Sequence, residues 1–339
     1  MTLLKKLLSI SIFSGLLIAN AQEKFTIGIA SCSKQDKDLS LLDKVVEKKP
    51  NLFIWMGDNI YGDTYDMTVL EAKYQKLTNN PHFKNLKKNV PMLSTWDDHD
   101  YGWNDAGKEY PHKEASKALF LKYWEVNNKF RQTNPNGIYG VEYFTFKNKK
   151  IQIIILDTRF NRDALCKFES TMPFGKNDYV PCRDTSKSFL GEAQWNWLEE
   201  ILKTPADLRI LVSSIQFSHE YNGWESWTNL PSQQQKMMDL IKKTKAENLF
   251  VISGDVHWGE LSKYSLPNQY PIYDLTSSGL TEKWPSLEPN KFRIGEAVVE
   301  LNYGIIEYDG ENQITFKLYD HKDILKLNYQ LDLETLKFK

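Results

Sequence analysis

Short apolar runs rich in β-branched residues alternate along this chain with segments of helical spacing. Runs such as residues 51–58 and 151–159 are nearly continuously apolar before they end in polar residues. This pattern indicates strands that are buried on both faces. Amphipathic segments such as residues 191–204 and 231–246 lie between the runs. The alternation therefore predicts a layered α/β domain in which helices cover the sheets.

The predicted elements follow one another without a linker, a repeat or a low-complexity stretch. The predicted strands are residues 24–31, 51–58, 89–100, 151–159, 208–216, 248–257, 271–278, 297–309 and 313–320. The predicted helices are residues 39–49, 113–127, 191–204 and 231–246, and the segment 69–86 is predicted to be helical in its first part. We therefore expect one domain over residues 22–339.

The first residues have the pattern of a secretory signal peptide. Lys5 and Lys6 precede an apolar run over residues 7–18, and residues 19–21 (Ala-Asn-Ala) fit a cleavage site. A membrane anchor is the alternative, but a spanning helix needs about 20 apolar residues. We therefore expect residues 1–21 to be removed, no stable membrane anchor, and a mature chain that is secreted or periplasmic.

Composition and charge limit the classes of partner. The 339 residues are 41% apolar and 26% charged, as in ordinary globular proteins. The formal net charge is −1 and no basic stripe is present, so a nucleic acid is not an expected partner. The sequence gives no indication of an oligomeric state.

The three cysteines allow at most one disulfide within the chain. Export implies an oxidising compartment in which disulfides persist. Cys166 and Cys182 share one segment that contains Pro and Gly and has little periodicity. A bridge there would restrict the unfolded chain. We therefore predict a Cys166–Cys182 disulfide and a free Cys32, which follows a predicted strand.

Six of the predicted strands end in polar residues. Their ends read IASCS, MGDNIYGD, TWDDHDYGWND, LDTR, SSIQ and SGDVHWGE. Ligands of open α/β sheets bind at the carboxyl ends of strands, so we expect these residues to share one site. The polar residues at these ends are Cys32, Asp58, Asn59, Tyr61, Asp63, Asp97, Asp98, His99, Asp100, Asn104, Asp105, Asp157, Arg159, Gln216, Asp255, His257 and Glu260.

These residue types suit metal-assisted hydrolysis of a phosphoester. Carboxylate, amide and imidazole groups bind hard or borderline ions, whereas a thiolate together with a tyrosine favours iron(III). One carboxylate can bridge two ions, and such a pair holds the attacking and leaving oxygens of a phosphoryl displacement. An arginine adds a bidentate grip on phosphate oxygens.

Each candidate also has an ordinary structural interpretation when it is taken singly. Asp58 could form a turn, His99 could be a half-buried histidine, and Cys32 could be a small buried hydrophobe. Tyr61 could pack in the core, and Asp157 and Arg159 could form an ion pair. Asp97 and Asp100 could act as caps. The coincidence of all these residues at strand ends favours a shared functional site.

Four sequence blocks resemble those of a known family. The blocks MGDNIYGD, TWDDHDYGWNDAG, LDTRFNRD and SGDVHWGE, in this order and spacing, resemble the alkaline phosphatase D-like (PhoD-like) family of the calcineurin-like metallophosphoesterases. The resemblance covers residues 25–320 and implies a four-layer αββα sandwich with a metal centre at the strand ends. It also implies a metal-dependent phosphoesterase that acts as an alkaline phosphatase or phosphodiesterase on a small phosphate ester.

The resemblance also implies a ligand set, although the chain departs from the general superfamily motifs. Residues 31–33 (Ser-Cys-Ser) stand in place of Asp-x-His, DDHD in place of GNH[DE], and GDVH in place of GHxH. The ligands implied for Fe(3+) are Cys32, Asp58, Tyr61 and Asp255. Those implied for neighbouring divalent ions, Ca(2+) in the best-known branch, are a bridging Asp58, Asp98 or Asn104, and His257.

The implied mechanism assigns roles to two further residues. A metal-bound hydroxide would attack phosphorus in line. Arg159 would neutralise phosphate charge, and His99 would stabilise or protonate the leaving oxygen. Two rival functions remain open. One is a secreted nuclease- or phospholipase-type phosphodiesterase on the same centre, and the other is a non-catalytic binding protein on this fold.

Four local features remain open. Residues 219–231 are expected to form a wall of the cleft and residues 161–183 a rim or lid, or else both are packed surface loops. Asp255 and His257 would point the same way if the extended geometry continued through them. Glu260 is expected either to hold His257 or to face solvent.

Overall fold

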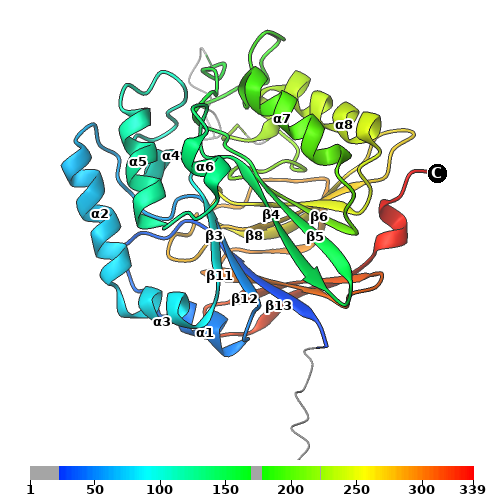
Figure 1. Cartoon of the computed structure of the whole chain (residues 1–339), viewed down its shortest axis with the longest axis horizontal. Coiled ribbons are helices and arrows are strands. Elements are labelled where there is room, and N and C mark those ends of the chain that lie inside the picture. Colours follow the sequence, from blue (N-terminus) through cyan, green and yellow to red (C-terminus); the bar gives the residue numbers. More distant parts are fainter. Residues whose placement is uncertain (1–22, 169–177, 222) are drawn as a thin grey trace, which may run out of the picture.

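Two stacked β-sheets with helices on both outer faces make up the fold (Figure 1). The computed structural model describes residues 23–168, 178–221 and 223–339, so the predicted signal peptide at 1–21 lies outside the described residues. Among the described residues, no helix has both the length and the apolar character needed to cross a lipid bilayer. The four-layer αββα sandwich expected from the sequence is the observed architecture.

The first sheet has the strand order β13-β12-β11-β1-β2-β3. Its strands are β1 (Phe25–Ala30), β2 (Leu52–Met56), β3 (Met92–Thr95), β11 (Asn302–Tyr308), β12 (Gln313–Asp320) and β13 (Leu325–Asp332). Strands β1, β2 and β3 run parallel, so their carboxyl ends meet at one edge, whereas β11 joins β1 antiparallel.

The second sheet has the order β10-β8-β9-β7-β6-β5-β4. Its strands are β4 (Gly140–Phe146), β5 (Lys149–Ile155), β6 (Leu208–Val212), β7 (Leu249–Ser253), β8 (Gly259–Tyr264), β9 (Ile272–Ser277) and β10 (Arg293–Val298). Strands β5, β6, β7 and β9 are parallel. The hydroxyl of Thr95 in the first sheet donates to the carbonyl of Leu156, just beyond β5, at 2.8 Å. The carboxyl ends of β3 and β5 therefore lie side by side.

Helices cover the outer face of each sheet. The α-helices are α1 (Leu41–Glu47), α2 (Met67–Asn79), α3 (Pro81–Asn89), α4 (Asp98–Tyr101), α5 (Lys113–Tyr123), α6 (Lys129–Thr133), α7 (Gly191–Lys203) and α8 (Pro231–Thr244). Helices α1, α2 and α3 pack on the first sheet and α7 and α8 on the second. The 3₁₀ helices are η1 (Trp227–Asn229) and η2 (Leu333–Leu336).

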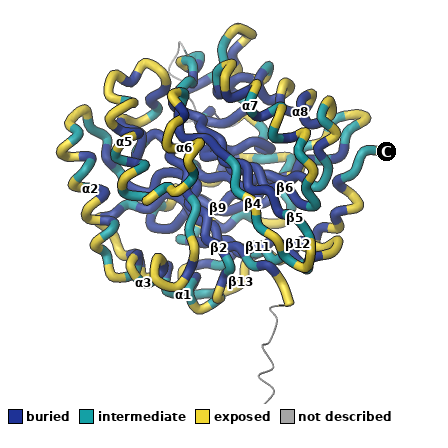
Figure 2. The backbone as a smooth tube through the Cα atoms, in the orientation of Figure 1, coloured by how far each residue is buried: buried dark blue, intermediate teal, exposed yellow. Residues whose placement is uncertain are grey.

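The alternation of side chains along β2 shows why its apolar run is continuous. Leu52, Ile54 and Met56 belong to the core between the sheets, whereas Phe53 and Trp55 belong to the core beneath helices α1, α2 and α3. All five side chains are buried. Figure 2 shows the same burial along most central strands, while exposed residues concentrate on the helices and loops.

Some predicted elements differ from the observed ones for local reasons. The segment 69–86, predicted to be helical only in its first part, holds two helices, because Asn80 caps the amides of His82 and Phe83 and Pro81 starts a new helix. The strand predicted over residues 89–100 ends at Thr95, and helix α4 begins at Asp98. Strands β4, β8, β10 and β13 were not predicted. Their apolar signal is weak, because residues in each of them remain partly or fully exposed.

Candidate metal centre

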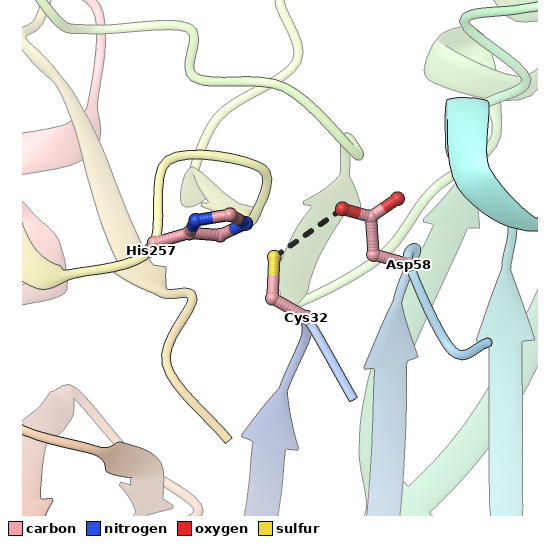
Figure 3. A group of neighbouring side chains, drawn as sticks. All are labelled: Cys32, Asp58 and His257. Carbon is pink, nitrogen blue, oxygen red and sulfur yellow. Dashed lines mark hydrogen bonds between the residues drawn. The ribbon is translucent and has the colours of Figure 1, made fainter. Parts of the chain in front are cut away.

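The predicted ligands come together where the two sheets present their carboxyl ends. Cys32 follows β1, Asp58 follows β2, and His257 follows β7 of the second sheet. The Cys32 thiol donates to Oδ2 of Asp58 at 3.4 Å, and the His257 ring lies on the other side of the sulfur (Figure 3). The hydroxyl of Ser278 lies 3.1 Å from the same sulfur. The Cys32 sulfur, the Asp58 carboxylate and the His257 imidazole are therefore directed towards one another.

Sharp turns at the strand ends aim these side chains. Cys32, Asp58, Asp255 and His257 all have left-handed backbones, with φ between +51° at Asp58 and +75° at Asp255. Such a conformation is unusual for residues other than glycine and costs on the order of 1 kcal/mol or more. The extended geometry of β7 therefore does not continue through Asp255 and His257, so the condition under which they would point the same way is not met. The turns, rather than strand alternation, bring the two side chains to the centre.

Two histidines and a tyrosine form one side of the centre. The Tyr61 hydroxyl lies 3.1 Å from Nε2 of His257. The Tyr61 ring also stacks on His99, with ring centroids 4.1 Å apart. Nδ1 of His99 lies 2.7 Å from Oδ1 of Asp63, which leaves Nε2 as its other polar atom. Asp63 therefore fixes the orientation of the His99 ring.

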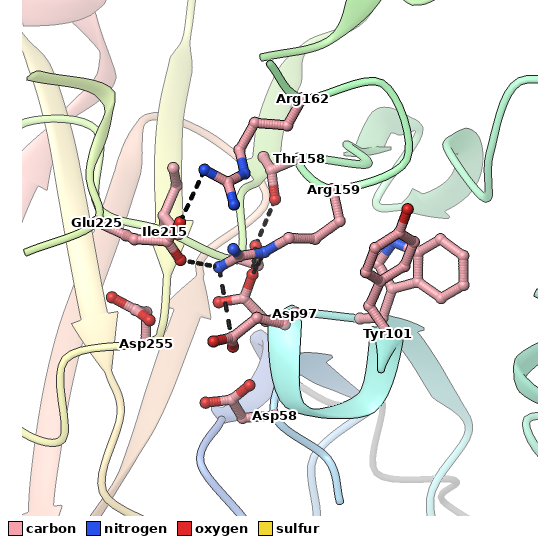
Figure 4. A network of polar contacts seen from close by, with 12 residues as sticks. Asp58, Asp97, Tyr101, Thr158, Arg159, Arg162, Ile215, Glu225 and Asp255 are labelled. Atoms are coloured by element: carbon pink, nitrogen blue, oxygen red, sulfur yellow. Dashed lines mark hydrogen bonds and ion pairs between the residues drawn. The ribbon is translucent and has the colours of Figure 1, made fainter. Parts of the chain in front are cut away.

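A buried network of charged groups forms the opposite side. Arg159 donates from Nε to Asp97, and its Nη2 lies 2.5 Å from a carboxylate oxygen of Glu225 (Figure 4). The hydroxyl of Ser214, beyond β6, donates to Asp97 at 2.6 Å. Arg162 pairs with the second Glu225 oxygen at 3.0 Å. The Arg159 side chain is fully buried, and it holds carboxylates instead of opening to solvent.

Some strand-end acids have structural roles. Oδ1 of Asp157 accepts from the Trp96 indole at 2.9 Å and from the Arg159 and Phe160 amides at 3.0 and 2.9 Å. Asp100 accepts from the backbone amides of Asp97 and Asn59. Asp157 therefore fixes the turn that carries Arg159, and Asp100 orients the start of helix α4.

The donor atoms fit metal ions, and Asp58 belongs to most of the groups they form. In each group the ligand atoms all lie within 4.8 Å of one another: Cys32 with Asp58 and His257; Asp58 with Asp98 and His99; Asp58 with Asp97, Asp98 and Asp255; and Asp98 with Asp105 and Glu225. Oδ1 of Asp58 and Oδ2 of Asp97 are buried and accept no hydrogen bond from any described residue. Buried carboxylate oxygens of this kind fit a cation as partner.

Burial is the main cause of the pKa shifts of Cys32, Asp58 and His257. Burial raises the pKa of Cys32 to about 12. Burial and the neighbouring charge of Asp98 raise the pKa of Asp58 well above its ordinary value. Burial lowers the pKa of His257 to about 4, so the ring is neutral at physiological pH and able to act as a ligand. A cation would compensate the crowded carboxylates and favour the deprotonated ligand atoms.

A cavity of about 150 Å³ opens onto these residues. Two predicted loops contribute to its wall. Asp178 and Tyr179 come from the loop after β5, and Trp224 and Glu225 come from the loop after β6. In contrast, Trp227 of the second loop is buried in the core. The lining residues are Asp58, Asp98, His99, Asn104, Asp105, Asp178, Tyr179, Trp224, Glu225, Asp255, Val256, His257, Trp258 and Trp284.

A disulfide joins Cys166 to Cys182, the pair expected from the sequence, with Cα atoms 5.3 Å apart. Cys32 is free and buried. The bridged loop carries Tyr179, whose hydroxyl donates to Asp105 at 2.6 Å. The disulfide therefore closes the loop that places Tyr179 against the cavity.

Glu260 has neither of the two roles considered for it. It is fully buried, and its carboxylate accepts from the Trp258 indole at 3.0 Å and from the Arg293 guanidinium at 2.5 Å. Gln216 donates to it at 2.7 Å, and Nε2 of His219 lies 3.3 Å away. By accepting from Trp258, Glu260 thus fixes the start of strand β8, which follows His257.

Reasoning from the sequence alone does not identify Glu225 or Ser278. Glu225 lies in a loop and gains its role only through Arg159 and Arg162, which are far from it in the sequence. Ser278 follows β9. Its hydroxyl oxygen contacts the Cys32 sulfur and accepts a hydrogen bond from the His257 amide at 2.9 Å. Serines beyond the ends of other strands offer the same local pattern, so only the sheet order could identify this one.

The fold is that of the metal-dependent phosphatases. It superposes on a solved structure of PhoD with a TM-score of 0.70 at 17% identity, covering 92% of this chain and 69% of that one. It also matches purple acid phosphatase PPD1 from yellow lupin seeds, with a TM-score of 0.63 at 10% identity, covering 91% of this chain and 54% of that one. A third match is GAP50, the anchor in the inner membrane complex of Plasmodium. That match has a TM-score of 0.56 at 15% identity and covers 94% of this chain and 90% of that one.

Within that class, the chain belongs to the PhoD-like phosphatase family, whose model matches residues 27–283. Alkaline phosphatase D of Bacillus subtilis (strain 168) is 24% identical over 246 residues. That alignment covers 66% of this chain and 41% of the relative. The resemblance seen in the sequence blocks is confirmed by the family match.

Proposed function

We propose that this protein is a metal-dependent hydrolase of small phosphate esters. The observation that carries the proposal is the sharing of Asp58 among three groups of ligand atoms, each compact enough to hold an ion. A shared carboxylate can bridge two ions and so suits a centre that holds more than one. The membership of the chain in a phosphatase family supports the same function.

The chemistry of the donor atoms supports a specific ligand assignment. Cys32, Tyr61 and Asp255 with Asp58 would hold Fe(3+), because a thiolate sulfur together with a phenolate oxygen suits that ion. The oxygen and imidazole donors of Asp58, Asp98 or Asn104, and His257 would hold Ca(2+) or another divalent ion. Asp98 is the favoured alternative, since its carboxylate groups with Asp58 and its second oxygen is fixed by the Asp105 amide at 2.8 Å.

When bound, such ions would lower the pKa of a coordinated water to near neutrality and polarise the phosphoryl group. The chain's own residues would orient the ester and manage its protons. His99 lines the cavity, and Asp98 and Asp63 raise its pKa to about 9 against the opposing effect of burial. With Nδ1 held by Asp63, Nε2 of His99 would donate a proton to the leaving oxygen.

Arg159 would act as a positioning residue. Its guanidinium lies behind the cavity wall and holds Asp97 and Glu225. We therefore assign it the orientation of these carboxylates instead of the direct grip on phosphate expected from the sequence. This assignment is consistent with the absence of Arg159 from the residues that line the described cavity.

The test is phosphate release from a chromogenic monoester and a diester by the purified mature protein, with and without a chelator. We expect metal-dependent release in the wild type. Asp58→Asn is expected to lose both bound metal and more than 99% of activity, since it removes the shared ligand (on the order of 10²-fold or more, as for loss of a central electrostatic group). Asp36→Asn, a surface acid paired with Lys73 and Lys76, is the matched control.

The same assay separates the rival functions. A diester-only activity would indicate a phospholipase- or nuclease-type phosphodiesterase. Absence of phosphate release with any metal would contradict the proposed enzymatic activity and favour a non-catalytic binding protein, because a fold does not by itself imply catalysis.

We further propose that residues 1–21 direct secretion or periplasmic export. The disulfide is compatible with that destination, and N-terminal sequencing of the exported protein would test the cleavage near Ala21.

A further inference from the structure

A second groove lies next to the metal cavity. It has a volume of about 490 Å³, and its lining includes the side chains of Tyr65 and Trp103. Asn104, Asp105 and Tyr179 line both this groove and the metal cavity. A ligand with its phosphorus at the metal centre would therefore reach the groove by passing these three residues.

The groove carries exposed aromatic rings that are in contact with one another. Tyr65 is 54% exposed and Trp103 is 44% exposed, although large aromatic side chains are usually mostly buried. Their ring centroids lie 5.4 Å apart with an interplanar angle of 23°, and Tyr65 also stacks on Tyr110 at 5.5 Å. Exposed apolar surface of this kind, beside a polar site, marks a place where a ligand binds.

The stacked rings of Tyr65, Trp103 and Tyr110 form a platform that is held in place before any ligand arrives. The Tyr110 hydroxyl donates to the carbonyl of Thr64 at 2.5 Å, and the Thr64 amide donates to the carbonyl of Gly102 at 2.7 Å. A Cβ at Gly102 would lie 2.2 Å from the Tyr110 ring, so only glycine allows this packing. The two loops that carry Tyr65 and Trp103 are therefore tied together. A preorganised surface loses little conformational entropy on binding.

We propose that this groove binds the organic substituent of the phosphate ester, with a preference for a planar aromatic substituent. The proposal rests on the proposed function, since it places the phosphorus at the metal centre. Charged side chains of both signs line the groove, namely Asp105, Glu109, Arg162 and Lys167. The stacked rings, rather than a net field, therefore select the ligand. Flat rings gain most from such a platform because they stack face to face with it in an offset arrangement.

The test compares two non-hydrolysable inhibitors, phenylphosphonate and methylphosphonate, against hydrolysis of one chromogenic phosphoester. We expect the wild type to bind phenylphosphonate about tenfold more tightly, a difference of about 1.4 kcal/mol. Tyr65→Ala and Trp103→Ala are each expected to lower this ratio towards one. Tyr65→Phe keeps the ring and is expected to keep the ratio. Tyr143→Ala removes another exposed aromatic ring, on strand β4, and is expected to leave the ratio unchanged.

Metal content and thermal melting of each variant show whether the fold and the metal centre are intact. A wild-type ratio near one, or an unchanged ratio in both Tyr65→Ala and Trp103→Ala, would overturn this inference while phosphate release continued to support the proposed function. Absence of phosphate release from every ester would instead overturn the proposed function and this inference together. A ratio that falls in both alanine variants, with metal content retained, would support the groove.

Discussion

The Arg159 guanidinium lies fully buried between the carboxylates of Asp97 and Glu225. Removing one partner of such a buried network leaves uncompensated charges, which costs about 3–5 kcal/mol. We therefore predict that Arg159→Met lowers the free energy of unfolding by about that amount, measured by urea denaturation at pH 7. Lys76→Met, which removes an exposed partner of Asp36, is the control and is expected to change it by about 0.5 kcal/mol or less. A loss of substrate affinity without a loss of stability would instead indicate that Arg159 contacts phosphate.

Glu260 gives a prediction about acid stability. Burial alone would raise the pKa of this carboxyl, but the charges of His219 and Arg293 bring it below its ordinary value. A carboxyl with a lowered folded-state pKa stabilises the fold above its unfolded-state pKa of about 4.3 and loses that contribution as the pH falls further. The stabilisation by Glu260 is therefore present at neutral pH and lost under acid conditions.

The measurement is the free energy of unfolding of the wild type and Glu260→Gln between about pH 7 and pH 3. We expect the wild type to be more stable at pH 7 and the difference between the two proteins to shrink as the pH falls below about 4.3. The control is Asp332→Asn, which changes an exposed carboxylate that caps η2 and lies outside the ion pairs of Glu260. Its free energy of unfolding is measured against the wild type over the same pH range. A difference that is constant over the whole range would contradict the assigned ion pairs.

At the scale of elements, the loop between β5 and α7 links the disulfide to the cavity. Cys166 and Cys182 are 16 residues apart, and closing a loop of this length stabilises a protein by about 3 kcal/mol in the chain-entropy model. The same loop brings Tyr179 to Asp105. Loss of the bridge should therefore affect both the stability of the fold and the wall of the cavity.

We predict that the double variant Cys166→Ala, Cys182→Ala loses about 3 kcal/mol in the free energy of unfolding. We expect its KM to rise more than its kcat falls, because the metal ligands come from other loops. Treatment of the wild type with a reductant provides the matched comparison. Equal stability of the reduced and oxidised proteins would count against a bridge that constrains this loop.

At the scale of the whole molecule, the candidate metal centre joins the two sheets. Its proposed ligands follow β1 and β2 of the first sheet and β7 of the second. Ions that bind only the folded chain stabilise it by about 2.7 kcal/mol when their concentration is 100 times the Kd. We therefore predict that chelation lowers the melting temperature and that adding back calcium and iron restores it. Asp58→Asn should melt at the same temperature with and without chelator, whereas equal responses in both proteins would contradict binding at Asp58.

The sequence could predict the layers and the identity of most residues at the centre. Continuous apolar runs require strands covered on both faces, and β2 satisfies this with Ile54 facing one core and Trp55 the other. The GD and GDVH blocks mark turns, because short polar residues after an apolar strand end it. Weaker patterns failed: the edge strand β13 is half exposed, so its apolar signal is small.

The sequence by itself determined the two-sheet α/β class, the family, and the strand ends at which Cys32, Asp58 and His257 lie. These features are local, since each depends on the pattern of a single run of residues. Only the tertiary structure decided that Glu225 and Ser278 join the centre, that Arg159 turns towards carboxylates, and that Tyr65 and Trp103 face a groove beside it. Those contacts join residues far apart in the chain, so they exist only once the sheets have stacked and fixed the order of the strands.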